Sequence, residues 1–153
     1  MEENPSASDR TFLEDLRRHR AELRESMSAL EDSLAAPTTA DHSRWAQRVH
    51  AALAEVAGDF RAHVDLTEGA HGLYRELLKT SPRLSGPVDG LTQEHIVIIG
   101  QIDTLLTHVT TPTVDPDRVR GSGTTLLGRL VRHRQRGSDL VFEAYEFDIG
   151  GET

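Results

Sequence analysis

Apolar residues recur every three or four positions along four long segments of this chain, and this spacing most constrains its fold. It places apolar side chains on one face of an α-helix, which must then be buried against other helices. In every segment a single histidine interrupts the apolar face. The interrupting residues are His19, His63, His95 and His133. The apolar positions are Phe12, Leu16, Leu23, Met27, Leu30 and Leu34; Trp45, Val49, Ala52, Val56, Phe60, Ala70, Leu73 and Leu77; Leu84, Val88, Leu91, Ile98, Ile102, Leu105 and Val109; and Val119, Leu126, Leu130, Leu140 and Ala144.

Capping residues, prolines and glycines set the expected helix ends. We expect helices from Ser8 or Asp9 to about Ala36, from Asp41 or Ser43 to about Leu78, from Pro82–Pro87 to about Val109, and from Asp115-Pro116 to about Asp148. A kink or loosening is expected in the second helix at Gly69 and Gly72. Short links favour antiparallel neighbours, so the sequence predicts an all-α, up-down-up-down four-helix bundle. The bundle is expected over residues 9–149, after a flexible N-terminal segment (1–8) and before a C-terminal tail (150–153).

Composition excludes several classes of function. The chain has no cysteine, which excludes disulfides, zinc ribbons and iron–sulfur clusters, so any metal must be held by nitrogen and oxygen. Seventeen basic and 25 acidic residues give a net charge of -8, which argues against a nucleic-acid partner. No apolar run is long enough to cross a bilayer, and the polar N-terminus does not resemble a signal peptide, so we expect a cytoplasmic protein. Arginine supplies all basic residues except Lys79, a usage typical of GC-rich bacterial genomes.

The four histidines indicate a metal site. A buried imidazole is costly unless both ring nitrogens find partners. In an antiparallel bundle the four residues lie at similar depth, to within about one or two helical turns. One histidine from each helix, converging on one interior layer, is typical of a metal centre in a helical bundle. The alternative is a layer of imidazoles bonded to one another, with a structural role only.

The chain resembles the hemerythrin-like HHE cation-binding domains. The strings FRAHVDLTE, LTQEH and LLGRLVRH carry the resemblance, together with one histidine per helix and the absence of cysteine. It covers roughly residues 12–148. The resemblance implies a non-haem di-iron centre, held by the histidines and by carboxylates one helical turn further on, and a small exogenous ligand such as oxygen, nitric oxide or peroxide. Carried over by position, it makes His19, His63, His95 and His133 ligands.

The carboxylates are where this chain departs from that family. Residues four apart share a helix face, and the family usually places an acid or a second histidine at that spacing. Here Thr67, Ile99 and Gly137 occupy those positions. Glu68, five residues after His63, is the expected remaining carboxylate ligand.

Other side chains were assigned lesser roles. Asp139 faces inward only if the helix widens at Gly137. Asp15 and Glu22 flank His19 and are expected to orient its ring. With four imidazoles and one acid, a single divalent ion is easier to support than two, and imidazole does not select among iron, zinc, copper and nickel.

The sequence therefore predicts a metal-binding bundle, with iron the expected metal, in a sensing, storage or redox role. Two alternatives remain open. A bundle whose metal site has decayed would act as a structural or protein-interaction module, and two of the histidines would suffice to hold a haem. Tyr74 and Tyr145 flank the histidine layer. We expect both to be core residues with a hydrogen-bonded hydroxyl, and a role as an oxygen ligand of the metal is the alternative.

Overall fold

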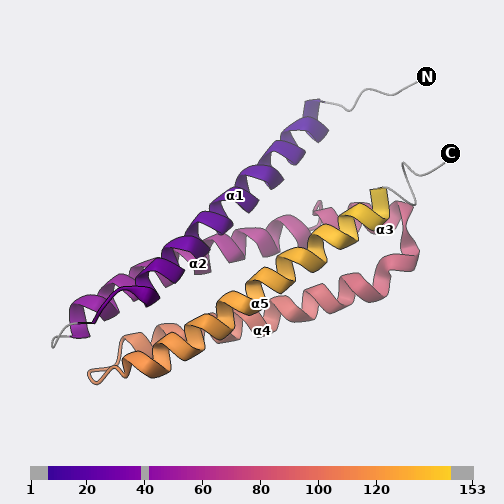
Figure 1. The fold of residues 1–153 in the computed structure, drawn as a ribbon. Helices are drawn as coiled ribbons and strands as arrows, with labels where there is room; N and C mark the ends of the chain where they lie inside the picture. The colour runs from indigo at the N-terminus through magenta and orange to yellow at the C-terminus, as the bar shows by residue number, and fades with distance from the viewer. Residues whose placement is uncertain (1–6, 39–41, 146–153) are drawn as a thin grey trace.

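The computed structural model describes residues 7–38 and 42–145, and within these ranges the regular elements are all helical. The elements are α1 (Ala7–Ala35), α2 (His42–Glu68), α3 (Leu73–Thr80), the short 3₁₀ helix η1 (Pro82–Leu84), α4 (Ser85–Val109) and α5 (Pro116–Phe142). The four long helices α1, α2, α4 and α5 run alternately up and down (Figure 1). This arrangement confirms the predicted all-α four-helix bundle. None of the described helices combines the length and the apolar character that spanning a membrane requires.

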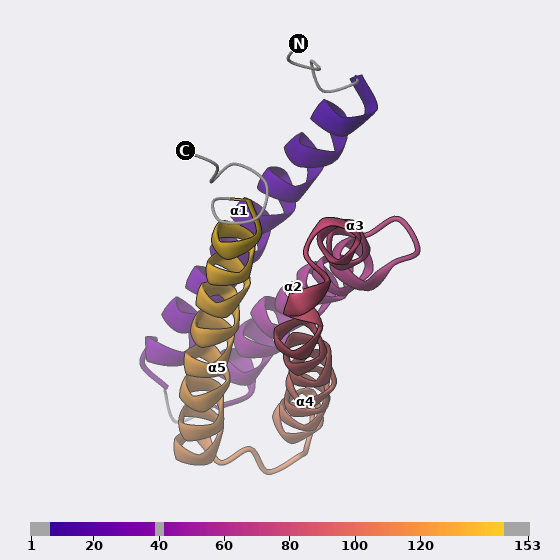
Figure 2. The ribbon, with the colours of Figure 1, turned by 90° about the vertical axis from the view of Figure 1, so that its right-hand side faces the viewer.

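The two ends of the bundle differ. The α4–α5 link lies at one end, with the last turn of α1 and the first of α2, and α3 lies at the other (Figure 1). At the α3 end, the first turns of α1 extend beyond the other helices in both views (Figure 2). Helix α1 therefore packs closely against the bundle only along its C-terminal part.

Most predicted helix ends lie close to the observed ones. The carboxylate of Asp115 accepts hydrogen bonds from the backbone N–H groups of Asp117 and Arg118, so it caps α5 as expected. Helix α1 begins at Ala7, just before the two residues expected to cap it. The rest of the predicted N-terminal segment (1–6), the predicted cap Asp41 and the tail 150–153 lie outside the described residues.

The second predicted helix does not continue to Leu78. Helix α2 ends at Glu68, and α3 begins at Leu73 as a separate helix. The backbone comes too close to itself in this turn to leave room for side chains. A Cβ atom at Gly69 would lie 2.5 Å from the Asp65 carbonyl oxygen, and one at Gly72 would lie 2.7 Å from that of Thr67. The predicted loosening is thus a complete break, which turns α3 back over the end of the bundle.

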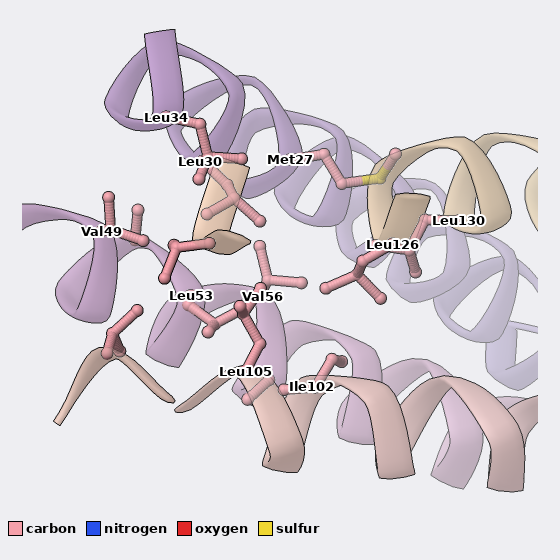
Figure 3. Close-up of a cluster of buried hydrophobic side chains, with 14 of the residues drawn as sticks. Met27, Leu30, Leu34, Val49, Leu53, Val56, Ile102, Leu105, Leu126 and Leu130 are labelled. Atoms are coloured by element: carbon pink, nitrogen blue, oxygen red, sulfur yellow. The ribbon is translucent and has the colours of Figure 1, made fainter. Parts of the chain in front are cut away.

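The buried apolar residues form two clusters. The larger one fills the bundle between α1, α2, α4 and α5 and includes Leu30, Leu53, Ile102 and Leu126 (Figure 3). The smaller one lies at the α3 end and joins α3 and η1 to α4 and the end of α5; its members are Tyr74, Leu77, Leu84, Val88, Leu91, Leu140 and Ala144. Along α4 and α5, one histidine separates the residues of one cluster from those of the other.

Candidate metal centre

Three imidazoles meet between the two apolar clusters. His63 comes from α2, His95 from α4 and His133 from α5. The Nε2 atom of His133 lies 3.1 Å from that of His63 and 3.0 Å from that of His95. His95 and His133 are each only 1% exposed. In each helix the histidine continues the apolar face that faces the core, which is why all three side chains point inward.

Two carboxylates bond to the outer nitrogens of these rings. Glu68 Oε2 lies 2.5 Å from His95 Nδ1, and Glu94 Oε1 lies 2.8 Å from His133 Nδ1. The guanidinium of Arg136 donates a hydrogen bond to the other oxygen of Glu94. Because an ionised carboxylate only accepts hydrogen bonds, it places the ring proton on Nδ1. When both rings are neutral, the Nε2 atoms of His95 and His133 carry lone pairs, and these lone pairs face each other.

The environment of His63 and His133 lowers the pKa of both side chains. Burial, followed by the neighbouring charges of His133 and His95, lowers the pKa of His63 from 6.5 to about 3. Burial, followed by the charge of His95, also lowers the pKa of His133. Burial therefore disfavours the charged form of His63 and of His133. His63 can donate its Nε2 proton to His133, and the 3.0 Å contact between His95 and His133 needs either a proton on one of the two Nε2 atoms or a cation between them.

The three nitrogens fit a metal ion. One nitrogen from each ring can be chosen so that all three lie within 4.8 Å of one another. Two imidazoles bound at about 2.1 Å and at right angles have nitrogens about 3.0 Å apart, which matches the two measured contacts. A cation at this point would also satisfy the facing lone pairs. Neutral imidazoles whose Nδ1–H groups bond to carboxylates are the usual form of histidine ligands.

Aromatic rings enclose the three imidazoles. Phe60, fully buried on α2, stacks on the His63 ring at 5.5 Å and meets the His95 and His133 rings edge-on at 5.6 and 5.8 Å. Tyr74 of α3 stacks on the other side of this layer, against His95 at 6.0 Å. Burial raises the pKa of Tyr74 to about 12, so its phenol stays protonated. Each ring is thereby held in one orientation.

The structure does not bring His19 into this group. Its Nδ1 lies 3.5 Å from Glu22, and its side chain is 27% exposed. Its side chain pairs with Glu22 of its own helix, and the first turns of α1 diverge from the other helices (Figures 1 and 2). Asp15, the other expected partner of His19, pairs instead with Arg18 at 3.0 Å. The cluster of imidazoles therefore contains three of the four histidines expected to meet, and the α1 histidine lies outside it.

The structure places the acids differently from expectation. Glu68 bonds to the outer nitrogen of His95, whereas the sequence suggested direct coordination beside His63. The five-residue spacing turns its carboxylate toward α4. Asp139 is exposed and accepts a hydrogen bond from Gln135, so it does not face inward, as it would have done only if the helix widened at Gly137. Glu94 was not identified from the sequence, although an acid directly before His95 was a possible signal. The contact could not be predicted from the spacing, because Glu94 bonds to His133 on another helix.

Thr67, Ile99 and Gly137 occupy the three positions where the family usually has an acid or a second histidine, and none of them offers a carboxylate or an imidazole. The Thr67 hydroxyl donates to the His63 carbonyl oxygen at 2.9 Å, and Ile99 packs partly buried against the larger cluster. A Cβ atom at Gly137 would meet nothing within 4 Å. The space beside His133 is thus left open.

Comparison with known proteins agrees with a four-helix bundle of the hemerythrin type. The family model described as "Hemerythrin HHE cation binding domain" matches residues 11–145. Searches against curated proteins and against solved structures give no match.

Proposed function

The chain belongs to the hemerythrin HHE cation-binding domain family, and we propose that His63, His95 and His133 bind one transition-metal ion, with iron as the expected metal. The single observation that carries the proposal is the 3.0 Å contact between two Nε2 atoms whose rings are both fixed by carboxylates at Nδ1. With both ring protons on Nδ1, two lone pairs face each other in this buried contact, and a cation between them would satisfy both.

The carboxylates adjust both charge and orientation. Glu68 and Glu94 contribute two negative charges next to three neutral ligands, which favours a divalent cation over an uncharged occupant. Arg136 holds Glu94 from the other side and offsets part of its charge. An ion with three nitrogen ligands is more simply accommodated here than two ions joined by bridging acids.

A small molecule such as oxygen, nitric oxide or peroxide is the proposed exogenous ligand. Three protein ligands leave coordination positions open, and iron bound there would supply the electrons for reversible binding or a redox reaction. The protein contributes a buried site whose rings contact Phe60 and Tyr74, and burial keeps the imidazole of His63 uncharged and available. The role would be sensing, storage or a modest redox reaction.

Haem is a weaker alternative for the same residues. Two axial imidazoles lie on opposite sides of a haem iron, with the macrocycle between them. Here the His133 nitrogen lies within 3.1 Å of both other nitrogens. It occupies the place that a macrocycle held by His63 and His95 would need.

Metal analysis of single variants tests the proposal. The protein is expressed in iron-supplemented medium and its metal content is measured by plasma mass spectrometry. We expect about one metal ion per chain in the unaltered protein, and a loss of most of it in His63→Ala, His95→Ala and His133→Ala. His19→Ala is the matched control because His19 lies outside the group, and it should keep its metal. Far-ultraviolet circular dichroism checks that each variant is folded.

The results separate the possible roles. No metal in any protein, even after anaerobic addition of ferrous ion, would leave the three histidines as a structural layer. About two ions per chain, or loss of metal in His19→Ala, would contradict the single site. If iron is bound, new visible absorption bands on addition of nitric oxide are the expected sign of an open coordination position. An unchanged spectrum would refute the proposed ligand class.

A further inference from the structure

A cavity of about 250 Å³ lies beside the histidine layer. It is enclosed by α1, α2, α3 and α5, and the imidazoles of His63 and His133 form part of its wall. Most of the remaining wall is apolar and includes Leu16, Leu23 and Val141. The part of α1 from Leu13 to Leu23 lines the cavity, and the first turns of this helix diverge from the other helices (Figures 1 and 2).

Two positions in the wall of the cavity lack a side chain that would fill it. Thr67 and Gly137 both line the cavity, and they lie four residues after His63 and His133, on the same helix faces. The Thr67 hydroxyl turns back to its own helix and bonds to the His63 carbonyl oxygen. Gly137 has no side chain, and a Cβ atom there would have open space around it. The chain therefore supplies no acid where one would face the histidine layer.

The cavity is positively charged in a protein whose net charge is -8. Arg17, Arg20 and Arg134 line it, and none of its described lining residues is acidic. Across the described residues, no carboxylate lies within ion-pair distance of these three arginines. Arg20 donates a hydrogen bond to the Ser138 hydroxyl at 2.8 Å, which holds it against α5. Guanidinium groups that lie together without an acid are a common arrangement for binding anions.

The outer part of the cavity is suited to an apolar group. Leu13 and Tyr145 line it, and they are 45% and 40% exposed, although both are large and mainly apolar. An exposed apolar surface next to a cavity marks a site for an apolar partner. An apolar cavity of ~150 Å³ accommodates benzene. A volume of about 250 Å³ therefore suits a molecule of about ten non-hydrogen atoms.

We propose that this cavity binds a small organic anion with an apolar chain. Arg20 and Arg134 would bind its carboxylate, and the leucines of α1 together with Val141 would cover its chain. The bound carboxylate would lie on the side of His63 and His133 where the chain itself lacks an acid. The binding depends on the arginines and the apolar wall, so it does not require a metal ion.

Octanoate, which has ten non-hydrogen atoms, is the probe that tests this proposal. Isothermal titration calorimetry is performed on metal-loaded and metal-free protein with octanoate, with 1-octanol as the neutral analogue and with acetate as the head group alone. We expect octanoate to bind both forms of the protein and to bind at least about tenfold more tightly than either analogue, since hydrogen bonds to charged groups contribute about 1.5–3 kcal/mol. Amide chemical shifts of Gly137 and Ser138 should move on addition of octanoate and locate the site.

Arginine variants identify the groups that bind the anion. The double variant Arg20→Gln/Arg134→Gln should lose at least about tenfold in octanoate affinity, and 1-octanol binding should not change. Arg132→Gln is the matched control, since Arg132 is exposed on the same helix as Arg134 and does not line the cavity. Circular dichroism and metal content check that the double variant is intact.

Three results would overturn the proposal. They are the absence of octanoate binding at millimolar concentration, equal binding of octanoate and 1-octanol, and unchanged octanoate affinity in the double variant. Binding that needs the metal and ignores the arginines would assign the anion to the metal ion instead. A protein that holds no metal but binds octanoate through the arginines would refute the proposed function and leave this inference standing.

Discussion

Replacing His63 with glutamine should remove much of the acid sensitivity of the metal-free protein. The folded-state pKa of His63 is lowered to about 3, below the ordinary value of 6.5, because burial and then the charges of His133 and His95 oppose its protonation. Between these two values the unfolded chain binds a proton that the folded chain does not. The free energy of unfolding therefore rises with pH in this window and is lost as pH falls from 6.5 toward 3.

The size of the effect follows from the two pKa values. One pKa unit corresponds to about 1.4 kcal/mol. Between pH 7 and pH 5, His63 alone should cost the folded state about 2 kcal/mol. His133, whose pKa is also lowered, adds a loss of the same sign. The His63→Gln variant should keep the contribution of His133 and lose that of His63.

Urea denaturation at several pH values measures this difference. Metal is first removed with a chelator, and the free energy of unfolding is determined at pH 7, 6 and 5 for the unaltered protein and for His63→Gln. His71→Gln is the control because His71 is exposed in the turn between α2 and α3. The reasoning is refuted if His63→Gln and the unaltered protein lose the same stability between pH 7 and pH 5.

Three further predictions follow from single contacts. Glu94→Gln should weaken metal binding by about 10- to 100-fold in a chelator competition titration, and Asp139→Asn, which alters an exposed acid, should not; equal affinities would contradict the role of Glu94. Gly123→Ala should lower the free energy of unfolding by about 1–3 kcal/mol, because its Cβ atom would lie 2.5 Å from Leu34; a stabilised variant would show that this leucine gives way. Asp115→Ala should cost about 0.5–2 kcal/mol through loss of the α5 cap, and an unchanged urea midpoint would count against that cap.

The sequence predicted the helices well because the apolar periodicity reports which face of each helix is buried. All the apolar positions expected in the third helix, from Leu84 in η1 to Val109 in α4, are buried, and so is His95, which interrupts them. The break between α2 and α3 could not be placed in the same way, since the apolar spacing continues through it. Only the close approach of Gly69 and Gly72 to the backbone of α2 shows that the helix ends.

The sequence predicted only part of the site, because apolar periodicity describes each helix separately. Periodicity places His63, His95 and His133 on core faces, but it does not state how far two helices diverge or which residues meet across them. His19 lies outside the cluster, and the contact between Glu94 and His133 joins two helices. Both depend on the packing of whole helices against one another, which a single sequence does not contain.

The imidazole layer also affects how the molecule unfolds. It divides the interior into a larger cluster and a smaller one, so without a cation the two hydrophobic units meet at a polar boundary. Polar boundaries weaken cooperativity, and regions with fewer apolar contacts exchange their amide hydrogens through local opening. The α3 end should therefore exchange before the larger cluster in the metal-free protein. An ion held by residues of α2, α4 and α5 would link the two units and make them open together, so that occupancy of the centre would be reported at amides far from it.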